Sequence, residues 1–154
     1  MTKRAYLIII GVLVLILAAI VYKFVVVGTT APGDDGRTAV MLAPAERALV
    51  LREMRGFVAG LQAMTDGLAR NDMKAVATAS RTMGMSRSHD APVALLGKLP
   101  LEFKSLAFSL HRDFDTIALD AETMAMPAHT LDQLATALQK CVACHELYQV
   151  RSTR

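Results

Sequence analysis

The residues best suited to chemistry lie near the C-terminus, in the segment Cys141-Val142-Ala143-Cys144-His145. On a helix, two thiols three residues apart both reach the vinyl groups along one edge of a haem, and the adjacent imidazole then faces the iron. C-x-x-C-H is the attachment signature of c-type haem, and here it uses both cysteines of the chain. The segment therefore predicts one covalently bound haem c with its iron.

Two other uses of these residues are a zinc site and a thioredoxin-like redox pair. A structural zinc site needs four ligands, but the remaining histidines, His89, His111 and His129, lie in different segments. A thioredoxin-like pair is expected beside a βαβ pattern, and the sequence has none. Haem attachment is therefore the favoured interpretation.

The N-terminus predicts a membrane anchor over residues 1–27. Ala5 to Val27 is a run of 23 residues interrupted by one charge, Lys23. As a helix it would span about 35 Å, enough for a hydrocarbon core of about 30 Å. Lys3 and Arg4 precede the run, so the positive-inside rule puts the N-terminus in the cytoplasm. We expect a single pass through a bacterial inner membrane, with the C-terminal domain in the periplasm; a cleaved signal peptide is the alternative.

Charge and length limit the remaining classes. The chain has 154 residues, enough for one domain, with 17 Lys and Arg against 14 Asp and Glu. Lys3, Arg4 and Lys23 account for the excess, so the rest of the chain is neutral. No basic surface is left for a nucleic acid, and we expect no nucleic-acid partner.

Between the anchor and the domain, residues 28–43 are rich in Gly, Pro, Thr and Asp and show no sustained period. They predict a flexible tether. From Pro44 onward the apolar residues recur with helical spacing, and no strand pattern competes. Residues 44–150 are expected to form the domain, and 151–154 a short tail.

Four amphipathic helices are predicted in this domain, over about 44–70, 73–85, 101–125 and 130–148. Thr130-Leu131-Asp132-Gln133 fits a capping box at the start of the last one. The connection 86–100 is long, and Asp90 could cap one helical turn within it. The predicted fold class is all-α: a four-helix bundle preceded by one transmembrane helix.

The helical faces bring candidate residues together. On the first helix of the bundle, Met54 and Leu61 lie at the centre of the apolar stripe. The remaining members of the stripe are Val50, Phe57, Val58, Met64 and Leu68. On the last helix the inner stripe consists of Leu134, Leu138, Cys141 and His145.

The chain resembles the cytochrome c′ family, including its low-spin members with a methionine ligand. Four helices over residues 44–150, with Cys141-Val142-Ala143-Cys144-His145 inside the last one, carry the resemblance. It implies that Cys141 and Cys144 form the thioethers, that His145 is the proximal iron ligand, and that Met54 approaches the other haem face. Arg47 is the nearest match to an arginine beside the haem propionates, although its spacing departs from the family pattern, as does the membrane anchor.

The distal ligand has competitors. A methionine in an apolar stripe is commonly core filling, and this is the alternative for Met54. Met64 lies about 80° away around the same helix, given about 100° per residue. His111 is placed on a solvated edge of the third helix, beside Lys104 and Asp115.

His145 and Met54 together predict a six-coordinate, low-spin haem suited to one-electron transfer. No acid–base constellation indicates an enzyme. The expected partner is a redox protein or a membrane complex, and a homodimer is also considered. Two alternatives stay open: a five-coordinate haem that binds NO or CO, and a haem-bearing subunit of a larger membrane complex. The second is favoured by the apolar residues Phe108 and Leu119, which face outward and could form an interface.

Overall fold

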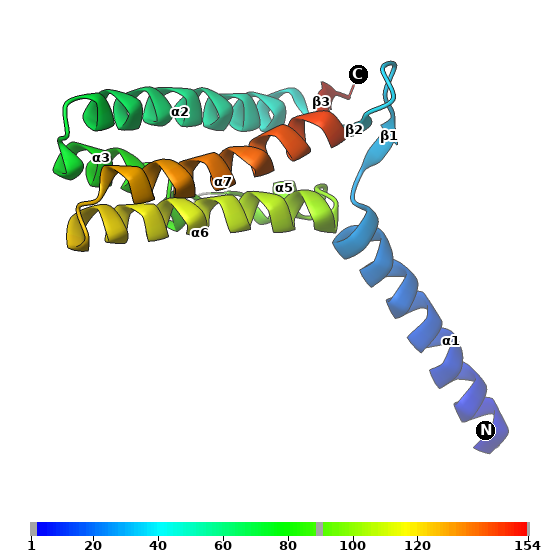
Figure 1. The fold of residues 1–154 in the computed structure, drawn as a ribbon. Helices are drawn as coiled ribbons and strands as arrows, with labels where there is room; N and C mark the ends of the chain where they lie inside the picture. The colour runs from blue at the N-terminus through cyan, green and yellow to red at the C-terminus, as the bar shows by residue number, and fades with distance from the viewer. Residues whose placement is uncertain (1–2, 89–90, 154) are drawn as a thin grey trace.

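Long helices dominate the molecule, as the sequence predicted. The computed structural model describes residues 3–88 and 91–153. Several helices lie side by side and α1 projects away from them (Figure 1). The long helices are α1 (Lys3–Val21), α2 (Pro44–Ala69), α3 (Met73–Arg81), α6 (Leu101–Thr123) and α7 (Pro127–Leu147). Two short helices, α4 (Met85–Ser88) and α5 (Val93–Leu96), lie in the connection between α3 and α6.

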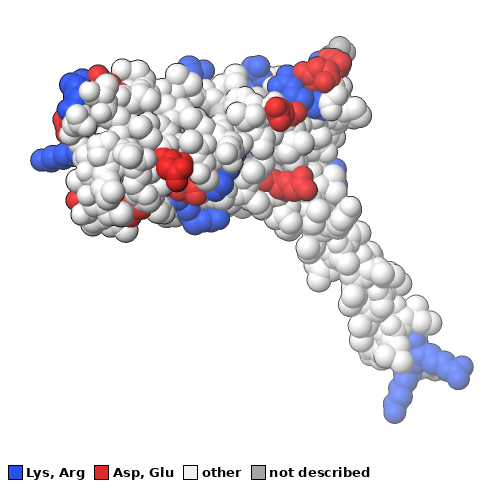
Figure 2. Space-filling view, viewed as in Figure 1, with Lys and Arg blue, Asp and Glu red and all other residues white. Residues whose placement is uncertain are grey.

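The N-terminal helix is long and apolar enough to cross a membrane. α1 continues into the π-helical segment η1 (Tyr22–Val27), and together they give 25 residues, Lys3–Val27. Their side chains are almost entirely exposed, with basic residues at the free end and none of either charge along most of the length (Figure 2). The far end is held against α6, because Lys104 Nζ donates a hydrogen bond to the Val25 carbonyl over 2.9 Å.

A small sheet replaces the expected tether and tail. β1 (Thr30–Pro32) pairs antiparallel with β2 (Thr38–Leu42), and β2 pairs in parallel with β3 (Tyr148–Ser152). The register joins Thr38 to Tyr148 and Leu42 to Ser152. The prediction of a flexible tether over 28–43 was therefore wrong, and the tail contributes to a strand as far as Ser152.

The physical reason is burial within the short strand β2. Ala39, Val40 and Leu42 are all fully buried. A strand of five residues that is covered on both faces has no alternating pattern, so periodicity cannot identify it. The neighbouring Gly and Asp residues, which suggested a tether, belong to the turn between β1 and β2.

Two hydrophobic cores stabilise the fold. The larger is formed by α2, α3, α6 and α7 and includes Phe57, Met64, Phe114 and Leu134. The smaller lies at the sheet end and includes Val40, Leu42, Phe103 and Tyr148, together with Leu95 and Leu99 from the connection before α6.

The start of α7 differs from the predicted capping box. The helix begins at Pro127, and the Thr130 amide donates to the Met126 carbonyl over 3.1 Å. Proline is well suited to the first turn of a helix, which explains the earlier start. Thr130 is thus inside the helix, and its Oγ1 has no hydrogen-bond partner within the described residues. The helical turn expected after Asp90 is α5, although Asp90 itself and His89 lie outside the described residues.

Candidate functional site

A groove of about 390 Å³ opens where α2 and α7 face each other. Its walls are mainly apolar and come from α2, α6, α7 and β3. All five predicted site residues line it: Arg47, Met54, Cys141, Cys144 and His145. The structure therefore brings together, from two helices far apart in the sequence, the residues that the sequence singled out.

The two cysteines lie on the α7 wall of the groove, one helical turn apart. Both are free thiols and partly buried. Cys141 packs against the larger core and Cys144 against the smaller one. The groove therefore lies at the junction between the two cores. His145, on the last turn of α7, is exposed at the same wall.

Burial sets the chemistry of these thiols. It raises the pKa of the Cys141 thiol above its usual value, and it does the same for Cys144, with a smaller contribution from Cys141. Redox-active cysteines have a lowered pKa, because the thiolate is the nucleophile. Both thiols are therefore protonated at neutral pH, which is the opposite of the activation found in a thioredoxin-like pair.

Helix α2 contributes apolar side chains that the neighbouring helices leave partly or largely exposed. Met54 and Leu61 are only partly buried beside the larger core, and Val58 is 68% exposed. The face of α2 that packs tightly is rotated from the predicted centre of the stripe and contains Phe57 and Met64. Five of the seven residues of the predicted stripe line the groove: Val50, Met54, Phe57, Val58 and Leu61.

Three basic side chains also line the groove, and two of them were not predicted. Arg47 donates from Nε to the Val150 carbonyl over 3.2 Å. Arg37, from the turn before β2, donates from Nη1 to the His145 carbonyl over 3.3 Å. Lys140 pairs with Asp113. No Asp or Glu is among the groove-lining residues in the described part of the chain. Sequence analysis missed Arg37 because only the pairing of β2 with β3 brings it to this wall.

Tyr148 closes the sheet end of the groove. Its hydroxyl donates to Glu102 Oε2 over 3.1 Å, and its ring meets Phe103 edge-on, with 5.4 Å between the centroids. Burial, with the Glu102 hydrogen bond, raises the pKa of Tyr148 to about 12. The phenol is therefore neutral at physiological pH, and the ring forms a fixed part of the groove wall. Helical spacing places Tyr148 at the end of the last predicted helix and so does not reveal this role.

The competing ligands do not line the groove. His111 is buried, with 5% of its surface exposed, so its placement on a solvated edge was wrong. The ring of Phe57 covers it at a centroid distance of 5.2 Å, and its Nδ1 lies 2.6 Å from the Met83 carbonyl oxygen. Met64 is fully buried and accepts a hydrogen bond from Ser80 Oγ at 3.3 Å. His129 lies against Asp120 instead.

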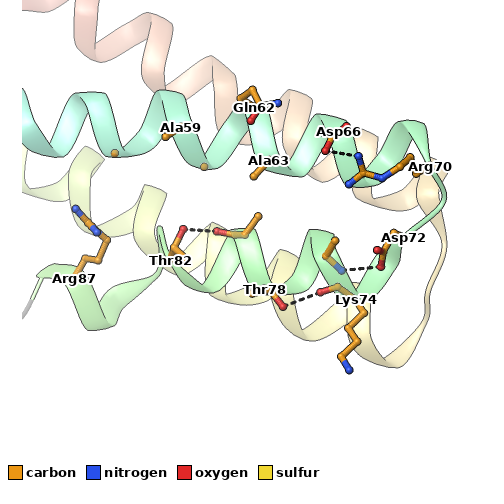
Figure 3. Close-up of a pocket in the computed structure, with 14 residues that line it drawn as sticks. Ala59, Gln62, Ala63, Asp66, Arg70, Asp72, Lys74, Thr78, Thr82 and Arg87 are labelled. Carbon is orange, nitrogen blue, oxygen red and sulfur yellow. Dashed lines mark hydrogen bonds and ion pairs between the residues drawn. The ribbon is translucent and has the colours of Figure 1, made fainter.

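A second hollow, of about 730 Å³, lies between α2 and α3 (Figure 3). It is wide and shallow, and much of its lining consists of Gly, Ala and Thr. Its acidic groups are already engaged: Asp66 pairs with Arg70, and Asp72 accepts from the Ala75 amide. None of the predicted site residues reaches it, and it offers no grouping suited to catalysis.

Within residues 3–88 and 91–153, no cluster of three or more His, Cys, Asp or Glu side chains is arranged to hold a metal ion. Comparisons of the chain with protein-family models, with curated proteins and with solved structures found no match.

Proposed function

We propose that the chain is a membrane-anchored c-type cytochrome that carries one electron at a time. In this proposal α2, α3, α6 and α7 form a four-helix bundle of the cytochrome c′ type. Cys141 and Cys144 hold one haem c, and His145 and Met54 are the iron ligands. The observation that supports it most strongly is that Cys141, Cys144 and His145 line one mainly apolar groove together with Met54.

The groove fits such a group in size and in chemistry. Its volume of about 390 Å³ falls within the range of about 300–1,000 Å³ found for ligand sites. An imidazole and a thioether are a ligand pair for haem iron, and two adjacent thiols suit covalent attachment. The bound group would supply a one-electron couple at its iron.

The residues of the chain would set the properties of that couple. The thioether of Met54 favours a higher potential than an open distal face. With the group bound, Val58, Leu61 and Phe57 would pack against it and exclude water, and a drier site also changes the potential. Arg47 would face an acidic group of the cofactor at the rim.

The anchor supports a location at a membrane. A helix long and apolar enough to span, with Lys3 and Arg4 in its first turn, is typical of a single-pass protein with its C-terminal domain outside the cytoplasm. We therefore place the domain on the periplasmic side of a bacterial inner membrane. Its partner would be a redox protein or a membrane complex.

The absorption spectrum of the reduced protein, with and without carbon monoxide, tests this function. We expect a low-spin spectrum that carbon monoxide leaves nearly unchanged. Met54→Ala should give a high-spin spectrum that shifts readily with carbon monoxide. Met64→Ala is the matched control, because Met64 lies on the same helix and does not reach the groove.

Two outcomes would contradict the proposed ligation. A wild-type spectrum that is already high-spin and responds to carbon monoxide would remove Met54 from the site and favour a gas-binding haem protein. An unchanged low-spin spectrum in Met54→Ala would assign the sixth ligand to another residue.

A further inference from the structure

The hairpin formed by β1 and β2 lies between the anchor and the helices, yet it reaches the groove. Arg37, at its turn, lines the groove and donates to the carbonyl of His145. Its neighbour Thr38 begins the parallel pairing with Tyr148, three residues after His145. The hairpin thus contacts the backbone on which the C-x-x-C-H segment ends.

The Arg37 side chain is held in a defined position. Its Nε and Nη2 donate to Asp35 Oδ2 over 2.8 and 2.6 Å. Asp35 is fixed in turn, because Oδ1 accepts from Gln149 Nε2 over 3.0 Å. With two nitrogens bound to Asp35, Nη1 remains for the His145 carbonyl. An arginine fork held in this way loses little further entropy when it binds an additional acceptor.

Two arginines lie at this end of the groove, and Arg37 is paired with Asp35. Arg37 and Arg47 both line it; Arg37 contacts the backbone in the last turn of α7, and Arg47 contacts the backbone of β3. Arg47 makes no ion pair with any described residue, and no acidic residue of the described chain lines the groove. A ligand that fits has an apolar body and an acidic group at this rim.

We propose that the hairpin is a functional part of the groove, in which Arg37 positions the backbone at His145 and provides a fixed positive charge for an acidic group of the ligand. The inference rests on the proposed haem function and extends the site beyond the helices. The resemblance to the cytochrome c′ family covers residues 44–150 and implies a site built from these residues alone. Here a segment next to the membrane would complete it.

Reduction potentials of the full-length protein in detergent test the inference, because a nearby positive charge favours the reduced form of the iron. Arg37→Gln should lower the potential, and Arg37→Lys should stay close to the wild type. Asp35→Asn removes the opposing negative charge and should raise the potential. Arg151→Gln is the control, since Arg151 pairs with Asp34 on the same hairpin and does not line the groove.

Opposite shifts separate a charge effect from damage to the fold. A loose hairpin would move the potentials of Arg37→Gln and Asp35→Asn in the same direction, and that result would overturn the inference, as would no shift in either. If Arg37→Gln fails to fold, the potentials of Asp35→Asn and Arg37→Lys still test the role of Arg37. A wild-type chain without haem, detected by its intact mass, would overturn the proposed function as well; a haem-bearing chain with unshifted variants would overturn only the role of Arg37.

Discussion

Helix α2 meets its neighbours differently along its two long faces. Beneath the shallow hollow beside α3 it is closely packed: a Cβ on Gly60 would clash with the side chain of Met83, just after α3, and Met64 is fully buried. Toward α7, Met54 and Val58 remain partly or largely exposed around the groove. Burial of large apolar side chains is the main stabilising term in folding. The apolar residues left open toward α7 therefore support the proposal that this face receives a ligand.

The two methionines of α2 give the largest expected contrast. Met64→Ala should lower the free energy of unfolding by about 2–5 kcal/mol, the usual cost of emptying a buried site. Met54→Ala should cost about 1 kcal/mol in packing, because its side chain is only partly buried. Urea unfolding in detergent measures both packing losses when the variants are made in a haem-free chain with both cysteines replaced by serine. Equal losses would mean that Met54 is core filling.

The close packing against α3 can be tested at Gly60. Gly60→Val should cost about 1–3 kcal/mol, since extra methyl groups would press against the buried Met83 side chain. Ala63→Val on the same helix is the control, because Ala63 is exposed. Thermal unfolding compares the two variants. If Gly60→Val is as stable as Ala63→Val, the side chain of Met83 can move aside and the packing at Gly60 is not close.

The junction between the anchor and the groove depends on Gly28. Its φ is +68°, and a Cβ would clash with the Lys98 carbonyl oxygen. Gly28→Ala should therefore cost about 1–2 kcal/mol, within the range for strained backbone, and should loosen the hairpin. Hydrogen exchange at the β2 amides measures the loosening. Gly11→Ala is the control, because its Cβ would meet no atom within 4 Å; similar exchange in both variants would contradict a docked junction.

The smallest expected effect concerns acid stability. Lys98, through its hydrogen bond, and the Ala43 amide lower the pKa of Glu46. A carboxyl group whose pKa is lower in the folded state adds stability above its unfolded pKa and loses it as the pH falls. The wild type should thus lose up to about 1 kcal/mol relative to Glu46→Gln between neutral pH and pH values below about 4. Urea unfolding curves of the wild type and Glu46→Gln at neutral and at acidic pH check this. Equal losses of the free energy of unfolding in the two proteins would rule out a role for Glu46.

The sequence predicted the helices better than the connections, and the residues that it singled out line one groove. Helical spacing placed α2 and α6 nearly to the residue, and Cys141 to His145 was identified by spacing alone. His111 was misplaced because the cover provided by Phe57 and the Met83 backbone depends on tertiary packing, which a single helical wheel does not contain. Arg37 and Tyr148 could not be found, since their position depends on a parallel strand pair between the two ends of the domain.

The proposed function requires that Cys141 and Cys144 bind a haem covalently in the groove between α2 and α7. The most direct test is the intact mass of the denatured protein, purified from bacteria that attach haem to exported proteins. We predict the mass of the chain plus one haem, and the mass of the chain alone when both cysteines are replaced by serine. A wild-type mass equal to the polypeptide alone, with two free thiols, would contradict the claim.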